Sequence, residues 1–118
     1  MTKEQVRLLV VDDEEAVRNL LQRILEGAGY QVTTAANGQE ALYQVSLGEV
    51  EAVLLDIKMP EMSGIEVLSK LTADSPDTCV IMVTSVVDMK TAIKTMKLGA
   101  YDYITKPFDT EMTCYRRC

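Results

Sequence analysis

The sequence predicts an α/β fold in which parallel strands alternate with helices. Three apolar runs, 7–11, 52–55 and 79–84, have the composition of strands that are buried on both faces of a sheet. Between them, apolar residues recur every three or four positions, as they do on one face of a helix. Because strand and helix patterns alternate five times, we expect a (βα)5 arrangement with helices on both faces of the sheet, folded as one domain over residues 1–118.

The first half of the chain predicts two strand–helix units. Residues 7–11 form the first strand, and the helix after them ends at the glycines of 27–29, a residue type that commonly ends helices. Residues 31–36 are more polar, which favours a strand at the edge of the sheet. Asn-Gly at 37–38 predicts a turn, and a short helix then ends at Gly48.

The second half predicts three more strands. Residues 52–55 form the third, and Ser63 and Glu66 match a capping box that opens the third helix. Residues 79–84 and 101–105 form the fourth and fifth strands.

Two further helices complete the pattern. Asp88 is placed to cap a fourth helix that ends at Gly99. One face of that helix is expected to carry Met89, Ala92, Ile93 and Met96. Lys106-Pro107 breaks the last strand, and a final helix is expected over about residues 109–118, short and with few apolar anchors.

These elements favour a flavodoxin-like, doubly wound three-layer sandwich with strand order 2-1-3-4-5. Right-handed crossovers connect the strands of such a sheet. In this order the first and third strands are neighbours. The carboxyl ends of all the strands meet at one edge, where folds of this kind bind their ligands.

Composition narrows the classes of function. A net charge of −6 argues against a direct nucleic-acid surface. The amino terminus contains no apolar stretch long enough for a signal sequence or a membrane span, so we expect a cytoplasmic protein without membrane contact. Cys79 lies in an apolar run and is expected to be a buried, inert thiol. Cys114 and Cys118 would share one helix face, and a redox or metal role for that pair is an alternative to a structural one.

Acidic residues follow two of the predicted strands. Asp12 and Asp13 come after the first strand, and Asp56 comes after the third. Because these strands are expected to be neighbours, the three carboxylates should converge in one pocket and repel one another. A divalent cation would relieve that repulsion. Oxygen ligands alone suit Mg²⁺, with Mn²⁺ as an alternative.

Two more polar residues stand at strand ends. Thr84 closes the fourth strand and Lys106 the fifth. A carboxylate flanked by a metal, an ammonium and a hydroxyl suits a phosphoryl group, whose spread negative charge needs fixed positive partners. Asp56, central among the acids, is the candidate nucleophile that would form an acyl phosphate. Taken singly, each residue also has a structural interpretation, such as a helix cap or a solvated lysine. Their conjunction at the strand ends favours phosphoryl chemistry.

Four segments resemble the receiver domain of two-component response regulators. They are VVDDE (10–14), LLDIKMPEMSG (54–64), VTS (83–85) and YITKPF (103–108). The resemblance implies a phosphoacceptor switch rather than an enzyme, in which Asp56 takes a phosphoryl group from a sensor histidine kinase or a phosphotransfer protein. It also implies that Asp13, Asp56 and the backbone carbonyl of Lys58 bind Mg²⁺, while Asp12 acts largely through water.

The same resemblance implies how the switch works. Lys106 would hold the phosphoryl oxygens, Thr84 would donate its hydroxyl, and Tyr103 matches an aromatic switch position; the Lys106-Pro107 bond is expected to be cis. Phosphorylation would then remodel the surface formed by the fourth helix, fifth strand and fifth helix. That surface would meet an output domain, a target protein or a second copy in a homodimer. Lys58 and Val86 would lie near the attacking water, which predicts slow to moderate autodephosphorylation.

Two rival functions are open to the sequence. A pseudo-receiver would use the same fold only for docking, and it would be marked by loss of Asp56, Lys106 or the acidic pair, all of which are present. A phosphatase of the haloacid dehalogenase type needs a second Asp two residues after the nucleophile, where this chain has Lys58. Nucleotide binding is disfavoured because no phosphate-binding glycine-rich loop follows a strand.

Overall fold

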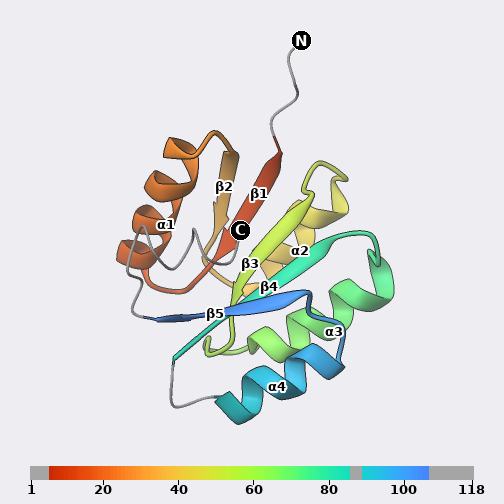
Figure 1. Cartoon of the computed structure of the whole chain (residues 1–118). Helices are drawn as coiled ribbons and strands as arrows, with labels where there is room; N and C mark the ends of the chain where they lie inside the picture. Colours follow the sequence, from red (N-terminus) through yellow and green to blue (C-terminus); the bar gives the residue numbers. More distant parts are fainter. Residues whose placement is uncertain (1–5, 86–88, 107–118) are drawn as a thin grey trace.

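The computed structural model describes residues 6–85 and 89–106, and at residues 84, 85, 89 and 106 it describes the backbone (Figure 1). Strands and helices alternate throughout: β1 Arg7–Val11, α1 Glu15–Gly27, β2 Gln31–Ala35, α2 Gly38–Ser46, β3 Ala52–Asp56, α3 Gly64–Asp74, β4 Cys79–Ser85, α4 Met89–Lys97 and β5 Asp102–Lys106. The expectations for Val86, Asp88, the Lys106-Pro107 bond, the last helix, Cys114 and Cys118 lie outside the described residues. Among the described helices, none has the length and apolar character needed to cross a membrane.

The strands form one parallel sheet in the order β2-β1-β3-β4-β5, which confirms the predicted flavodoxin-like fold. β1 and β3 are buried along nearly their whole length, as expected for central strands, whereas β2 alternates between exposed and half-buried residues at the edge. The register aligns Asp56 with Val83, and Ser85 with Lys106. The carboxyl ends of β3, β4 and β5 therefore lie at the same edge of the sheet.

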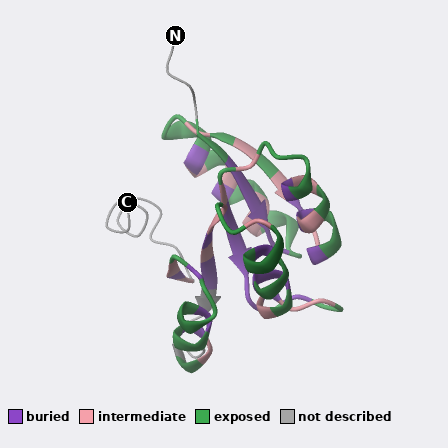
Figure 2. Ribbon diagram, turned by 90° about the vertical axis from the view of Figure 1, so that its right-hand side faces the viewer, coloured by how far each residue is buried: buried purple, intermediate pink, exposed green. Residues whose placement is uncertain are grey.

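The sheet separates two apolar cores, and Figure 2 shows its buried strands between helices with exposed outer faces. Leu9, Leu55 and Met82 point to the face covered by α2 and α3. Leu8 and Leu54, one position away in the pleat, belong to the core that contains Leu21 and Leu25 of α1. Because successive strand residues point to opposite faces, one apolar run supplies both cores.

An apolar groove of about 310 Å³ lies on the α1 side of the sheet, towards β4 and β5. Its lining includes Leu8, Leu25, Leu54, Ile81, Tyr101 and Ile104. The chain leaves β5 at Lys106.

Asn37 lies in the bend between β2 and α2, where the Asn-Gly pair predicted that the chain turns, and it also caps α2. Its side-chain oxygen accepts a hydrogen bond from the Glu40 N–H at 2.9 Å, and the Glu40 carboxylate accepts one from the Ala36 N–H at 2.9 Å. Short polar side chains serve turns and helix starts by the same hydrogen bond to a nearby N–H, so one Asn can mark both features. The predicted capping box of Ser63 and Glu66 is confirmed.

The apolar face expected for α4 is only partly buried in the structure. Ile93 is 53% exposed and Met96 is 38% exposed, whereas Ala92 and Thr95 are buried. The Thr95 hydroxyl satisfies its hydrogen-bonding need by donating to the Ala92 carbonyl at 2.6 Å. A narrow face of small side chains therefore contacts the protein, and the larger apolar side chains are left at the surface.

Candidate metal centre

Three carboxylates meet at the carboxyl edge of the sheet. Asp12 and Asp13 follow β1, and Asp56 is the last residue of the neighbouring β3. One oxygen from each lies within 4.8 Å of the others. Asp12 is 1% exposed and Asp56 is 5% exposed, while Asp13 is open to solvent. The convergence expected from the strand order is confirmed.

The segment after Asp56 folds back tightly on the strand end. The Gly64 N–H donates a hydrogen bond to the Ile57 carbonyl at 2.8 Å, which closes the loop. A Cβ on Gly64 would lie 2.1 Å from the Asp56 carbonyl oxygen. Only glycine lets the two backbones approach this closely. Asp56 thus ends a buried strand and borders a compact loop that contains Lys58.

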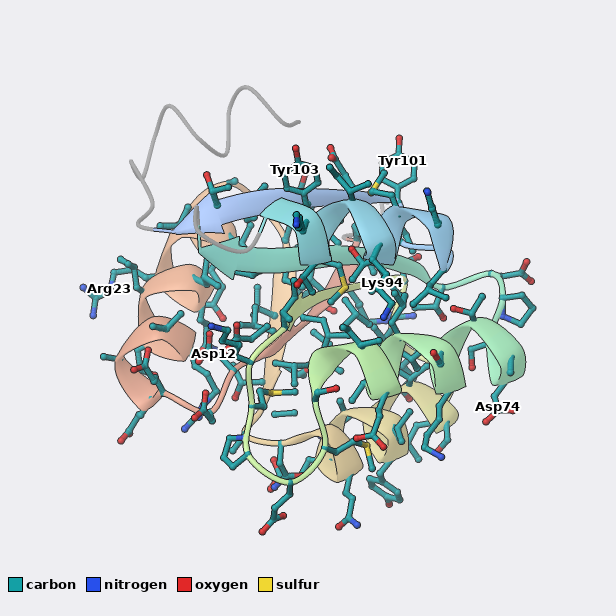
Figure 3. The ribbon with its side chains drawn as sticks, turned by 90° about the horizontal axis from the view of Figure 1, so that it is seen from below. Asp12, Arg23, Asp74, Lys94, Tyr101 and Tyr103 are labelled. Atoms are coloured by element: carbon teal, nitrogen blue, oxygen red, sulfur yellow. The ribbon has the colours of Figure 1, made fainter. Side chains whose placement is uncertain are left out.

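Asp12 is held by contacts from three directions. Its N–H donates to the Ala35 carbonyl of β2 at 3.2 Å, and its Oδ1 accepts from the Glu14 N–H at 2.9 Å. Its carbonyl accepts a hydrogen bond from Arg18 Nη1 of α1 at 2.8 Å. Figure 3 shows Asp12 between α1 and the segment that leads into α3. The sequence analysis missed Arg18, because an arginine on an amphipathic helix carries no signal that separates it from a solvated surface residue.

The three carboxylates have the chemistry that a small divalent cation requires. Hard oxygen ligands are the preferred partners of Mg²⁺, and its ligand oxygens lie up to about 4 Å apart across the ion. The spacing of the Asp12, Asp13 and Asp56 oxygens, within 4.8 Å, is compatible with one ion. Their combined negative charge in a largely buried place also favours a cation. The donor set therefore fits Mg²⁺.

The backbones of Thr84 and Lys106 lie at the same sheet edge. Thr84 pairs with Thr105, and Lys106 is the last residue of β5. Their side chains are outside the described part of the structure. Tyr103 lies in the middle of β5, half-buried against the core that α2 and α3 cover. The Lys58 side chain is exposed.

Cys79 lies away from this site, at the start of β4. It is half-buried rather than buried as predicted. Burial raises the pKa of its thiol above the ordinary value, and the nearby carboxylate of Asp102 raises that pKa further. A protonated thiol is a poor nucleophile, which agrees with the expected inert role.

Comparison with known proteins identifies the family. The model of the response regulator receiver domain matches residues 8–115. The chain belongs to the response regulator receiver domain family. This receiver domain is 42% identical over 109 residues to the transcriptional regulatory protein ZraR of Klebsiella oxytoca, covering 92% of the chain and 25% of that protein. It is 38% identical over 105 residues to the regulatory protein AtoC of Escherichia coli K12, covering 89% of the chain and 23% of that protein.

Solved structures agree with this assignment. The receiver domain of NtrX from Brucella abortus superposes with a TM-score of 0.87 at 30% identity and covers 93% of both chains. The chemotaxis protein CheY4 of Vibrio cholerae gives a TM-score of 0.88 at 29% identity, covering 97% of this chain and 96% of that one. The receiver domain described here spans about a quarter of the length of the ZraR and AtoC relatives.

Proposed function

We propose that this receiver domain is a Mg²⁺-dependent phosphoacceptor switch and that Asp56 is the residue phosphorylated. One observation carries the proposal: Asp56, 5% exposed at the end of a central strand, has its carboxylate beside those of Asp12 and Asp13. Like charges that lie close together, two of them buried, are costly unless a cation or a reaction uses them. The donor would be the phosphohistidine of a sensor histidine kinase or of a phosphotransfer protein.

The chemistry is an in-line displacement at phosphorus. An Asp56 carboxylate oxygen forms the new O–P bond while the P–N bond to the donor imidazole breaks, and the imidazole leaves with the electron pair and takes up a proton. When bound, Mg²⁺ would supply positive charge against the phosphoryl oxygens. Asp13, Asp56 and the Lys58 carbonyl would hold it, with Asp12 acting largely through water and Mn²⁺ as a substitute. Lys106 and Thr84, at neighbouring strand ends, would meet the remaining phosphoryl oxygens.

Phosphorylation would then bias the surface made by α4, β5 and the expected last helix. The added group carries nearly two negative charges. Thr84 would move towards it, and Tyr103 would turn inward into the space released. Figure 3 shows Tyr103 on β5 and Tyr101 just before that strand, beside α4. Tyr101 is 71% exposed, so this surface already presents an aromatic side chain to a partner.

The partner would be an output domain, a target protein or a second copy of the chain. α4 presents the exposed apolar side chains of Ile93 and Met96. The exposed side chains of Lys90, Lys94 and Lys97 surround them. An apolar centre with a charged rim is typical of protein interfaces. Docking without phosphorylation, the pseudo-receiver function, is the alternative.

Intact mass spectrometry tests the proposal. Treatment with acetyl phosphate and Mg²⁺ should add one phosphoryl group, about 80 Da. The gain should vanish in Asp56→Asn and persist in Asp74→Asn, which removes the same charge from an exposed position at the end of α3. Absence of any gain in the unaltered chain would favour the docking function.

A further inference from the structure

Arg18 of α1 forms a hydrogen bond with the backbone between Asp12 and Asp13, the two acidic residues that follow β1. Its Nη1 donates a hydrogen bond to the Asp12 carbonyl at 2.8 Å. That carbonyl belongs to the peptide unit that joins Asp12 to Asp13. The Arg18 residue as a whole is half-buried at this position on α1. A hydrogen bond from a charged donor is stronger than one between neutral groups, so this contact can hold the carbonyl in place.

Fixing this carbonyl constrains Asp13 through the geometry of the peptide bond. The six atoms from the Asp12 Cα to the Asp13 Cα lie in one plane, so the orientation of the carbonyl sets the orientation of the next Cα. Asp12 is held independently by Ala35 and Glu14. Asp13 is exposed and has no comparable support from burial. The orientation of the Asp13 carboxylate therefore depends on this peptide plane.

We propose that Arg18 is a positioning residue of the metal centre: by holding the 12–13 peptide plane it directs the Asp13 carboxylate towards Asp56. This inference rests on the proposed function, because it concerns the same acidic site. Residues that orient ligands without touching the metal commonly change metal affinity by about tenfold or more. Arg18 would act through Asp13 and not on the reacting atoms.

The sign of one measurement separates this role from a simple effect of charge. A guanidinium beside carboxylates weakens the attraction of the site for Mg²⁺. If charge were the whole effect, its removal would tighten Mg²⁺ binding. If Arg18 positions Asp13, its removal loosens Mg²⁺ binding in spite of that electrostatic gain. The two explanations predict opposite changes in the dissociation constant.

Isothermal titration calorimetry of the domain with Mg²⁺ alone measures the dissociation constant for Mg²⁺. Arg18→Met keeps good helix propensity and removes both the charge and the hydrogen bond. We expect about tenfold weaker Mg²⁺ binding. The matched control is Arg23→Met, which removes the same charge from an exposed side chain that points outward from α1 (Figure 3) and should leave the affinity unchanged. Equal or tighter binding in Arg18→Met would overturn the proposal.

A second measurement on the metal-free domain does not depend on Mg²⁺ at all. The backbone order parameter of the Asp13 amide, from NMR relaxation, should fall in Arg18→Met from about 0.85 towards about 0.6. If Arg18→Met does not fold, the same measurement is made on Arg18→Gln, because glutamine also has good helix propensity. An unchanged order parameter would also overturn the proposal. If the unaltered domain binds no Mg²⁺, the proposed function fails, and the order parameter still decides the role of Arg18.

Discussion

Gly64 and Asp56 are in backbone contact: a single carbon atom added to Gly64 would lie 2.1 Å from the Asp56 carbonyl oxygen. The same carbon would lie 2.8 Å from the Ile57 Cα. Because both neighbours are backbone atoms, neither can rotate away. The loop from Asp56 to Gly64 can therefore keep this path only with glycine at position 64.

Gly64→Ala should lower the free energy of unfolding by about 2–3 kcal/mol, because the backbone must shift to admit the methyl group. It should also slow phosphorylation by acetyl phosphate, since the displaced backbone belongs to Asp56. Gly27→Ala is the matched control. A Cβ there meets nothing within 4 Å, and the change should leave stability equal or raise it by about 0.4–1 kcal/mol. Urea denaturation of both variants measures the difference; equal stabilities would contradict the contact.

Mg²⁺ should stabilise the domain through the acidic cluster. Ligand at about one hundred times its dissociation constant contributes about 2.7 kcal/mol to a folded state that alone binds it. Asp13→Asn should reduce this contribution. In the metal-free domain the same change should raise stability, because it removes one of three mutually repelling charges. Thermal unfolding with Mg²⁺ and with EDTA measures both effects. Asp74→Asn should be stabilised by Mg²⁺ as much as the unaltered chain is. If Mg²⁺ also stabilised Asp13→Asn to that extent, the result would argue against this metal site.

The cap of α3 should be worth about 1 kcal/mol. The Ser63 hydroxyl accepts a hydrogen bond from the Glu66 N–H at 3.3 Å, so Ser63→Ala leaves a helix-end N–H without that acceptor. Ser69→Ala, an exposed position within α3, is the comparison and should be neutral or slightly stabilising. Chemical denaturation of the pair measures the cap. A loss that is equal in both variants would indicate an effect of composition rather than capping.

The Cys79 thiol should react slowly with alkylating reagents at neutral pH and faster as the pH rises. Burial and Asp102 both raise its pKa, so little thiolate is present. Asp102→Asn should lower that pKa partway and speed alkylation at a given pH, while the amide keeps an acceptor for the Tyr103 N–H. Asp74→Asn should not change the rate.

The same raised pKa fixes the sign of the pH dependence of stability. The folded state holds its proton more tightly than the unfolded chain. The contribution of the protonated Cys79 thiol to the free energy of unfolding is therefore complete below the pKa that the thiol has in the unfolded chain. It is lost as the pH rises through the pKa of the thiol in the folded state. Cys79→Ser should remove this part of the alkaline loss of stability, measured by denaturation across alkaline pH.

Much of the fold could be predicted because its signals are local or follow general rules. Apolar runs marked the central strands, and the rules for connecting parallel strands then placed Asp12 and Asp13 beside Asp56. The misses depend on three-dimensional context. The exposure of Ile93 reflects how α4 is rotated on the sheet, which helical spacing alone does not determine. The contact from Arg18 to Asp12 depends on the direction of a long side chain, which leaves no mark in the sequence.

The order of the strands also sets the separation between Asp56 and Tyr103. β4 is the single strand between β3, which ends at Asp56, and β5, which contains Tyr103. Two interstrand spacings make about 10 Å. The acidic cluster and the part of β5 that contains Tyr103 are therefore separated by about two strand spacings, with β4 between them.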